Sequence, residues 1–408
     1  MSDTQISASG TKPEASAPLG EHGSLRRIAF GVIPLVLLTI VLAVIISTDA
    51  GMGDRTAPPV EVLSVQRVAL PAPGQITVDI VNDGPDPVTI AQVLVDDAYW
   101  QHEFEGDRTL GRLASARITI PYPWVAGETH MLGLVTSTGL VTEAEIPVAV
   151  ESPHADKNTF ARFALIGLYV GIVPVSLGLL WFPFLRGLGR NGMRFILALT
   201  VGLLLFLVID MFSEAQEVAT TVPATFNGAL LVPAIALLTL LVMSTLANRK
   251  KSQDDTNLDV SYRIALGIGL HNLAEGLAIG AAFATGAVSL GVFLVIGFTL
   301  HNVTEGVGIA SPILHQRPAL HHFVWLATLG GIPAVFGIWI GGFVYSPLSA
   351  TIFLAVGIGA IAQVIIDVSR MIARGADRRG GQFLGWATLS GVGTGMGVMY
   401  LTALLVAG

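Results

Sequence analysis

Two copies of a His-Asn-x-x-Glu-Gly motif are the part of this sequence best suited to chemistry. The motif occupies residues 271–276 and again 301–306, each in the middle of an apolar segment, 264–283 and 288–314. Residues four apart share one face of a helix, so the imidazole stands over the carboxylate in each copy. The short connector 285–287 makes the two helices antiparallel neighbours. We therefore expect the motifs to meet at one depth, with the candidate ligands His271, Asn272, Glu275, His301, Asn302 and Glu305.

Carboxylates inside an apolar helix pair call for a compensating cation. A carboxylate at the centre of a bilayer costs about 2.5–3.5 kcal/mol on insertion scales, and two facing carboxylates repel. Neutral His nitrogen and Glu oxygen atoms are ligands that zinc, iron(II) and manganese accept. The simpler alternative is a pair of protonated Glu side chains that hydrogen-bond to His and Asn between helices. The duplication at mid-helix favours a divalent metal site.

The composition indicates which kind of protein positions these residues. Hydrophobic residues make up 52% of the chain, charged residues only 12%, and there are 46 glycines, as in polytopic helical membrane proteins. The net charge of −7 comes without a basic block, which argues against a nucleic-acid partner. The chain has no cysteine, so metal ligands must be N and O atoms, which disfavours copper(I).

Nine apolar segments predict membrane-spanning helices. The first covers residues 28–46 and follows a polar, Ser/Ala/Gly/Pro-rich tail. We interpret it as a retained anchor, because it is longer than the apolar part of a cleaved signal peptide, which is the alternative. The other eight cover 164–182, 195–212, 228–246, 264–283, 288–314, 323–344, 350–366 and 383–406.

Between the first and second apolar segments the chain is predicted to be β-rich and soluble. Alternating or β-branched runs at 60–68, 75–81, 88–95, 116–120, 131–136 and 141–150 are separated by turn residues such as Asn82-Asp83-Gly84-Pro85. This pattern predicts an all-β, immunoglobulin-like sandwich. The expected organisation is a disordered cytoplasmic tail (1–27), a transmembrane anchor (28–48), an extracytoplasmic sandwich (49–158) and an eight-helix metal-transport domain (159–408).

The distribution of Lys and Arg predicts the orientation. Fifteen of the 22 basic residues lie in segments that would face the cytoplasm if the N-terminus does, and the other seven lie in the sandwich or its connector. We therefore expect a multi-pass protein of the cell membrane with a cytoplasmic N-terminus. The sandwich and the C-terminus would be extracytoplasmic.

The paired motif resembles that of the ZIP family of divalent-metal transporters, in which two core helices carry His-Asn-x-Pro-Glu-Gly or close variants. The likeness covers residues 160–408 and is concentrated in the two motif helices. Ala274 and Thr304 stand where the family usually has proline, which affects the expected helix kinks rather than the ligands. The resemblance implies eight core helices with inverted-repeat symmetry, a homodimer, elevator-like movement of the motif helices, and transport into the cytoplasm.

Acidic residues on the second core helix extend the candidate site. Asp210 and Glu214 lie four apart at the end of an apolar run, in a segment that resembles the family's His-x-x-Pro-Glu-Ala. We count both among the candidate metal ligands, and Met211 and Glu217 as residues of the pathway that leads to them. An ordinary acidic helix end is the alternative.

Five further polar residues are candidates for the pathway. Asp367 is an isolated acid in the seventh core helix, with Gln363 four residues before it and Arg370 as a possible partner three residues after it. The loop after the fifth core helix carries three histidines that could receive a metal ion or simply be solvated, namely His315, His321 and His322.

Together these features predict a transporter of divalent transition metals, not an enzyme. Zinc is the first expectation and iron(II) or manganese the next, and the expected partners are the lipid bilayer, metal ions and a second copy of the chain. One alternative is an intramembrane zinc hydrolase, which would need an open coordination position and a general base. A metal sensor that signals through the sandwich is the other alternative.

Overall fold

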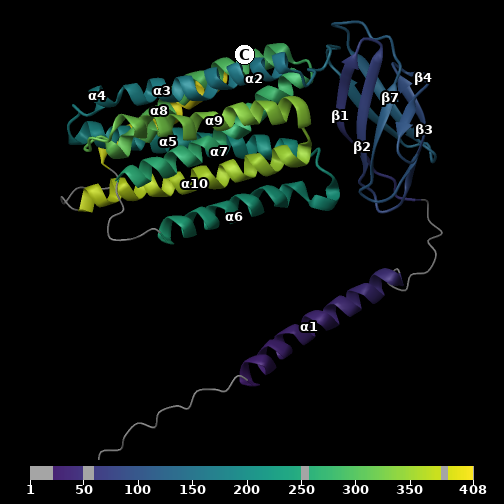
Figure 1. Cartoon of the computed structure of the whole chain (residues 1–408), viewed down its shortest axis with the longest axis horizontal. Helices are drawn as coiled ribbons and strands as arrows, with labels where there is room; N and C mark the ends of the chain where they lie inside the picture. The colour runs from purple at the N-terminus through teal and green to yellow at the C-terminus, as the bar shows by residue number, and fades with distance from the viewer. Residues whose placement is uncertain (1–21, 49–58, 250–256, 378–384, 408) are drawn as a thin grey trace, which may run out of the picture. The chain divides into compact units, whose positions relative to one another are not determined.

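The computed structural model describes residues 22–48, 59–249, 257–377 and 385–407 (Figure 1). The chain divides into two compact units, residues 1–59 and 60–408. The expected tail falls mainly in residues 1–21, and the start of the expected sandwich in residues 49–58. Both stretches lie outside the described residues.

The first unit contains one helix, α1 (His22–Ser47). It begins six residues before the expected anchor, because residues 22–27 include only one glycine and no proline that would oppose a helix. Val32–Ser47 is a short apolar helix, and its side chains are exposed. An exposed, uniformly apolar helix is what a membrane-embedded segment requires.

The second unit begins with two antiparallel β-sheets. One sheet has the order β1 (Leu63–Ala72), β2 (Gln75–Asn82), β7 (Ser115–Ile120), β5 (Glu103–Glu105). The other has the order β4 (Ala98–Trp100), β3 (Val88–Val95), β8 (His130–Thr136), β9 (Val141–Ile146), and β6 (Thr109–Leu110) pairs with β3. The six expected strands are present. Strands β4, β5 and β6 were not predicted, because two or three residues are too few to show an alternating pattern.

Alternating burial explains how the two sheets hold together. Along β2 every second side chain is buried, and Ile76, Val78 and Ile80 are completely inaccessible. They pack in one cluster with inward side chains of the other sheet, such as Val93 and Leu132. Each such side chain contributes about 1.5–3 kcal/mol relative to an exposed one. The sandwich therefore has a hydrophobic core of its own.

The rest of the second unit is helical. The first expected core span, 164–182, is a helical rod with breaks, made of α2 (Lys157–Gly167), a π-helical turn η2 (Leu168–Ile172), α3 (Val173–Leu180) and α4 (Phe182–Leu185). The later helices are α5 (Arg190–Ala219), α6 (Gly228–Arg249), α7 (Asn257–Ala284), α8 (Val288–Ala310), α9 (Leu320–Val344), α10 (Pro347–Asp377) and α11 (Trp386–Ala407), with short 3₁₀ turns η3 (Ala224–Phe226) and η4 (Ser311–Ile313).

Seven of these helical segments are long and apolar enough to cross a membrane. They begin with Lys157–Leu185 and end with Pro347–Arg374, and they coincide with the first seven expected core spans. The eighth expected core span coincides with α11, whose middle is rich in glycine. The described chain thus has the composition and helix lengths of a multi-pass membrane protein with a small β region.

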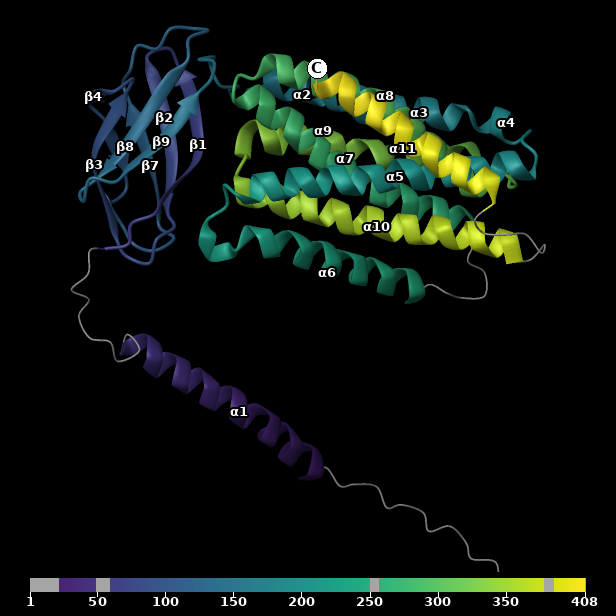
Figure 2. The ribbon, with the colours of Figure 1, turned by 180° about the vertical axis from the view of Figure 1, so that it is seen from behind.

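Glycine allows the helices to pack backbone to backbone. Helices α7 and α9 lie side by side in both views (Figures 1 and 2). A Cβ atom at Gly276 would collide with the Ala334 carbonyl, and one at Gly337 would collide with the Leu273 carbonyl. Helix α11 crosses α5 in the same way at Gly202. Such close contacts are typical of membrane helices, in which small residues let backbones approach.

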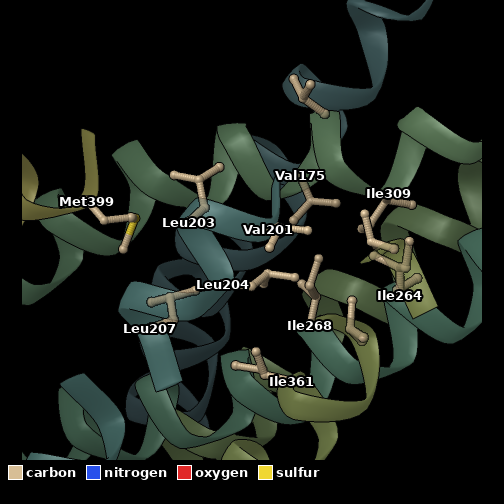
Figure 3. Close-up of a cluster of buried hydrophobic side chains, with 14 of the residues drawn as sticks. Val175, Val201, Leu203, Leu204, Leu207, Ile264, Ile268, Ile309, Ile361 and Met399 are labelled. Atoms are coloured by element: carbon tan, nitrogen blue, oxygen red, sulfur yellow. The ribbon is translucent and has the colours of Figure 1, made fainter. Parts of the chain in front are cut away.

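Large aliphatic side chains fill the centre of the bundle. Figure 3 shows Val175 from α3, Leu204 from α5, Ile268 from α7 and Ile361 from α10 meeting in one cluster. All four are at most 1% exposed. This packing joins the motif helix α7 to α5 and α10.

The sandwich contacts three connections at one end of the bundle. Arg67 donates from Nη1 to the carbonyl oxygen of Phe343, 2.9 Å away. The Asp83 carboxylate accepts hydrogen bonds from the backbone N–H groups of Ala224 and Thr225. Ser152 donates to the carbonyl of Ala284 at 3.4 Å. The α5–α6, α7–α8 and α9–α10 connections are therefore all held by the β region.

Candidate metal centre

The two motifs meet at a shared carboxylate. His301 Nε2 on α8 and Glu275 Oε1 on α7 form a hydrogen bond of 2.6 Å. The two helices are antiparallel because the connector turns at Gly286, whose φ of 78° suits glycine. Of the His, Asp and Glu side chains in the described ranges, His271, Glu275 and His301 form the one group whose ligand atoms all lie within 4.8 Å of one another. All three are buried, so the expected convergence is present.

His271 presents its second nitrogen to the same oxygen. Its Nε2 lies 2.9 Å from Glu275 Oε1, and its Nδ1 lies 2.9 Å from the Met211 sulfur on α5. A thioether cannot donate a proton, so this contact assigns the ring proton to Nδ1. The Nε2 lone pair then faces a carboxylate oxygen, an arrangement that is repulsive unless a proton or a metal ion lies between them.

Glu305 is the unsatisfied acid of the site. It is 3% exposed, and its two carboxylate oxygens have no hydrogen-bond partner among the described residues. Its Oε1 lies 3.7 Å from His271 Nε2. Burying a carboxyl group without donors is costly, and a nearby cation would remove that cost. Glu305 lies just outside the group of three and could complete its coordination.

The two motif asparagines are anchored to backbone carbonyls, and Asn302 also donates a long hydrogen bond of 3.4 Å to Glu275 Oε2. Asn272 donates from Nδ2 to the Gly330 carbonyl on α9, and Asn302 donates from Nδ2 to the Val170 carbonyl in η2, both at 2.9 Å. The Oδ1 atoms of both amides are buried without a partner. These carbonyl anchors were not predicted. The signal for the Asn302 anchor in the sequence is Pro174, four residues after Val170, because proline has no N–H to donate to that carbonyl.

A cavity of about 480 Å³ opens beside the cluster. It is lined by His271, Glu275 and His301 and by the α5 residues Asp210, Met211, Glu214 and Glu217. The structure thus brings the acidic end of α5 to the motif pair. Asp210 and Glu217 are exposed and Glu214 is half-buried, so these carboxylates lie on the approach to the site. Met211 is more central than predicted, because it touches His271 directly.

A second cavity, of about 380 Å³, shares Glu214 with the first. Its wall reaches Thr285 in the α7–α8 connector and Tyr345 after α9. Burial raises the pKa of the Tyr345 phenol, and the nearby Glu214 carboxylate adds to the increase. The two cavities together extend from the cluster to the end of the bundle that the sandwich contacts.

Asp367 and Gln363 lie outside both cavities. The Asp367 carboxylate is 3.7 Å from Arg370, the expected partner, and 3.3 Å from Arg263 on α7, which was not predicted. Gln363 is buried and accepts a hydrogen bond from Ser244 on α6. Both side chains therefore join α10 to neighbouring helices.

The three loop histidines are not gathered into one site. His315 is exposed after η4. His321 and His322 begin α9 with their ring centroids 4.1 Å apart, and His322 Nδ1 lies 2.9 Å from the Tyr262 hydroxyl. None of the three lines either cavity.

Comparison with known proteins does not identify a relative of this chain. No family model matches the chain, and no curated protein matches it. The function must therefore be inferred from the buried cluster, the cavities and the helices that hold them.

Proposed function

We propose that this protein carries divalent transition-metal cations across a membrane and that the ion binds at mid-bundle. The observation that carries the proposal is the convergence of His271, Glu275 and His301 on one buried point beside an acid-lined cavity. Two imidazoles and a carboxylate suit zinc first, and also iron(II) and manganese.

The electrostatics of the cluster support a cation as its occupant. Glu275 and Glu305 are both buried within a bundle of apolar helices. Without a cation, two nearby carboxylates in a medium of low dielectric would repel or would have to be protonated. A divalent ion neutralises both acids and occupies the space that the His271 lone pair faces.

The arrangement of helices supports a membrane transporter of the ZIP type. The candidate ligands lie on two neighbouring helices, and the cavities give access to them from one end of the bundle. We further propose that the sandwich is immunoglobulin-like, since its sheet orders correspond to the A-B-E-D and C′-C-F-G arrangement of that fold. The basic residues support a cytoplasmic N-terminus in the cell membrane, with the sandwich outside.

A second copy of the chain is the proposed protein partner. Side chains of α6 such as Leu230, Leu238 and Leu241 are exposed, and only 11% of the apolar stretch of this helix is buried. In a bilayer this face would contact lipid or another α6, so a homodimer is compatible with it.

Uptake of radioactive zinc into proteoliposomes tests the proposal. Wild-type protein should accumulate zinc, and Glu275→Gln, which keeps the shape but removes the charge, should reduce uptake at least about a hundredfold. Glu143→Gln is the matched control, because Glu143 is exposed in β9 of the sandwich, away from the cavity. Zinc uptake by correctly inserted Glu275→Gln protein at the wild-type rate would refute the site.

An intramembrane zinc hydrolase remains the second candidate, because Glu305 is unpartnered beside the three-residue cluster. It could act as a general base on a zinc-bound water. A hydrolase would cleave a membrane-embedded peptide or ester without moving zinc, whereas a transporter would move zinc without cleaving either. The proteoliposome experiment therefore separates the two.

A further inference from the structure

The backbone acceptor of Asn302 lies in a helix that is interrupted. In a regular α-helix the Val170 carbonyl would accept from the N–H of residue 174, but that residue is proline, which has no N–H. The local helix is also widened, since the N–H of Val173 reaches back to the carbonyl of Leu168 in a π-type bond. The Asn302 side-chain amide donates to Val170 at 2.9 Å in place of the missing backbone donor.

Asn272 is also anchored on a helix carbonyl, in α9. Its amide donates to the Gly330 carbonyl at 2.9 Å, inside a continuous helix in which Pro333 withholds its N–H from Leu329 rather than from Gly330. The two acceptor segments are in direct contact, because Cβ atoms at Gly171 and Gly331 would each collide with the backbone of the other segment. Both asparagines are therefore anchored on one joint between the first core rod and α9.

A carbonyl acceptor determines which way an amide side chain points. Since a carbonyl can only accept, each asparagine must turn its NH₂ group toward the joint, and its Oδ1 must point away from it. Both Oδ1 atoms are buried and unpartnered. They are the type of neutral oxygen ligand, or acceptor for a metal-bound water, that a cation site uses.

We propose that Pro174 is a positioning residue of the metal site. By leaving the Val170 carbonyl available to Asn302, it orients the Asn302 amide and keeps the hydrogen bond of that amide to the Glu275 carboxylate long, at 3.4 Å. This inference rests on the proposed function, because it concerns the same bound ion.

The Pro174→Ala substitution shows why the proline matters. Alanine supplies an N–H that competes for the Val170 carbonyl. The Asn302 amide already donates a long hydrogen bond of 3.4 Å to Glu275 Oε2, and an amide released from Val170 would move closer to that carboxylate. The shorter bond would occupy an oxygen that the ion needs. Affinity for Zn²⁺ should fall about tenfold, in the range typical when a group that orients a metal ligand is lost.

The experiment is titration of full-length purified protein with Zn²⁺ by calorimetry, together with its thermal unfolding. Pro174→Ala should weaken Zn²⁺ binding about tenfold while the apo protein melts at the same temperature or higher, because alanine is the better helix former. A proline that only shapes the helix would change the melting temperature and leave the affinity alone. Pro233→Ala is the control, because Pro233 lies inside α6 and lines neither cavity.

A double-mutant comparison ties the effect to the asparagine. In an Asn302→Ala background, Pro174→Ala should cause no further loss of Zn²⁺ affinity. Unchanged affinity in Pro174→Ala, or an equal loss with and without Asn302, would overturn the inference. Wild-type protein that binds no Zn²⁺ would instead refute the proposed function. If Pro174→Ala does not fold, Pro174→Ser, which also supplies an N–H, applies the same test.

Discussion

His271 on α7 contacts Met211 on α5 through an Nδ1–Sδ distance of 2.9 Å. This contact joins the motif helices, which carry the acids and imidazoles, to a helix outside the motif. It also assigns the ring proton and directs Nε2 toward Glu275. The orientation of the candidate ligand His271 is thus controlled by a side chain of a different helix.

Replacement of Met211 by leucine should change metal preference more than stability. The two side chains have similar volumes, so the packing cost should stay below about 1.5 kcal/mol. The loss of sulfur removes a soft, polarisable group beside the site, so affinity for Cd²⁺ should fall severalfold more than affinity for Mn²⁺. Competition binding with the two ions measures this ratio. An unchanged ratio of Cd²⁺ to Mn²⁺ affinity would mean that Met211 only fills space. The control is Leu207→Met, at a neighbouring buried position of the same helix.

One ion per chain should bind tightly at mid-bundle. Glu275 and Glu305 are the acids of the motif pair, and α9, which packs against α7, contains no acid. Two divalent ions about 4 Å apart would repel strongly at low effective dielectric, with too little negative charge to offset them. Equilibrium dialysis should give close to one high-affinity Zn²⁺ per chain. Two ions of similar affinity, both lost in Glu305→Ala, would contradict this prediction.

Asp83 should stabilise the connection between α5 and α6. Its carboxylate accepts from the N–H groups of Ala224 and Thr225, and hydrogen bonds to a charged group contribute about 1.5–3 kcal/mol. Asp83→Ala should therefore increase amide hydrogen exchange in residues 220–228. Asp107→Ala, at an exposed position elsewhere in the sandwich, should leave that exchange unchanged. Equal exchange in the two variants would mean that the contact contributes little in solution.

Acid should weaken the sandwich through Asp96. Partial burial opposes ionisation, but hydrogen bonds from the Met131 N–H, His130 and the Tyr122 hydroxyl prevail and lower the pKa of Asp96. A carboxyl group with a lower pKa in the folded state stabilises that state above its unfolded pKa of about 3.9. This contribution is lost as the pH falls through the folded pKa.

Unfolding measurements on wild type and Asp96→Asn check the direction. The variant should unfold more easily at pH 7, and the difference between the two proteins should shrink as the pH falls below about 3.9, where the carboxyl group of the unfolded chain takes up a proton. A difference that stays constant with pH would show that the effect comes from packing rather than from charge.

Local patterns determined much of this protein's architecture. The length of the apolar segments predicted the long helices. A membrane-spanning helix satisfies its own backbone hydrogen bonds, so it requires only a run of apolar residues long enough to cross the bilayer. Alternation predicted the six longer strands, because side chains on a strand point to opposite faces. The spacing of four within each motif placed His271 over Glu275 and His301 over Glu305, and the short connector predicted that the motifs meet.

Tertiary structure decided which groups the candidate ligands contact. Met211 touches His271, Arg263 joins Arg370 at Asp367, and Glu305 stands slightly apart from the group of three. These contacts depend on how helices from distant parts of the chain are rotated and how deep they lie in the bundle. Glycine contacts and core packing determine both, and the periodicity of the local sequence does not encode them. The asparagine anchors are the clearest case. Pro174, which frees the Val170 carbonyl, is visible in the sequence, but only the packed bundle brings Asn302 to Val170 and Asn272 to Gly330.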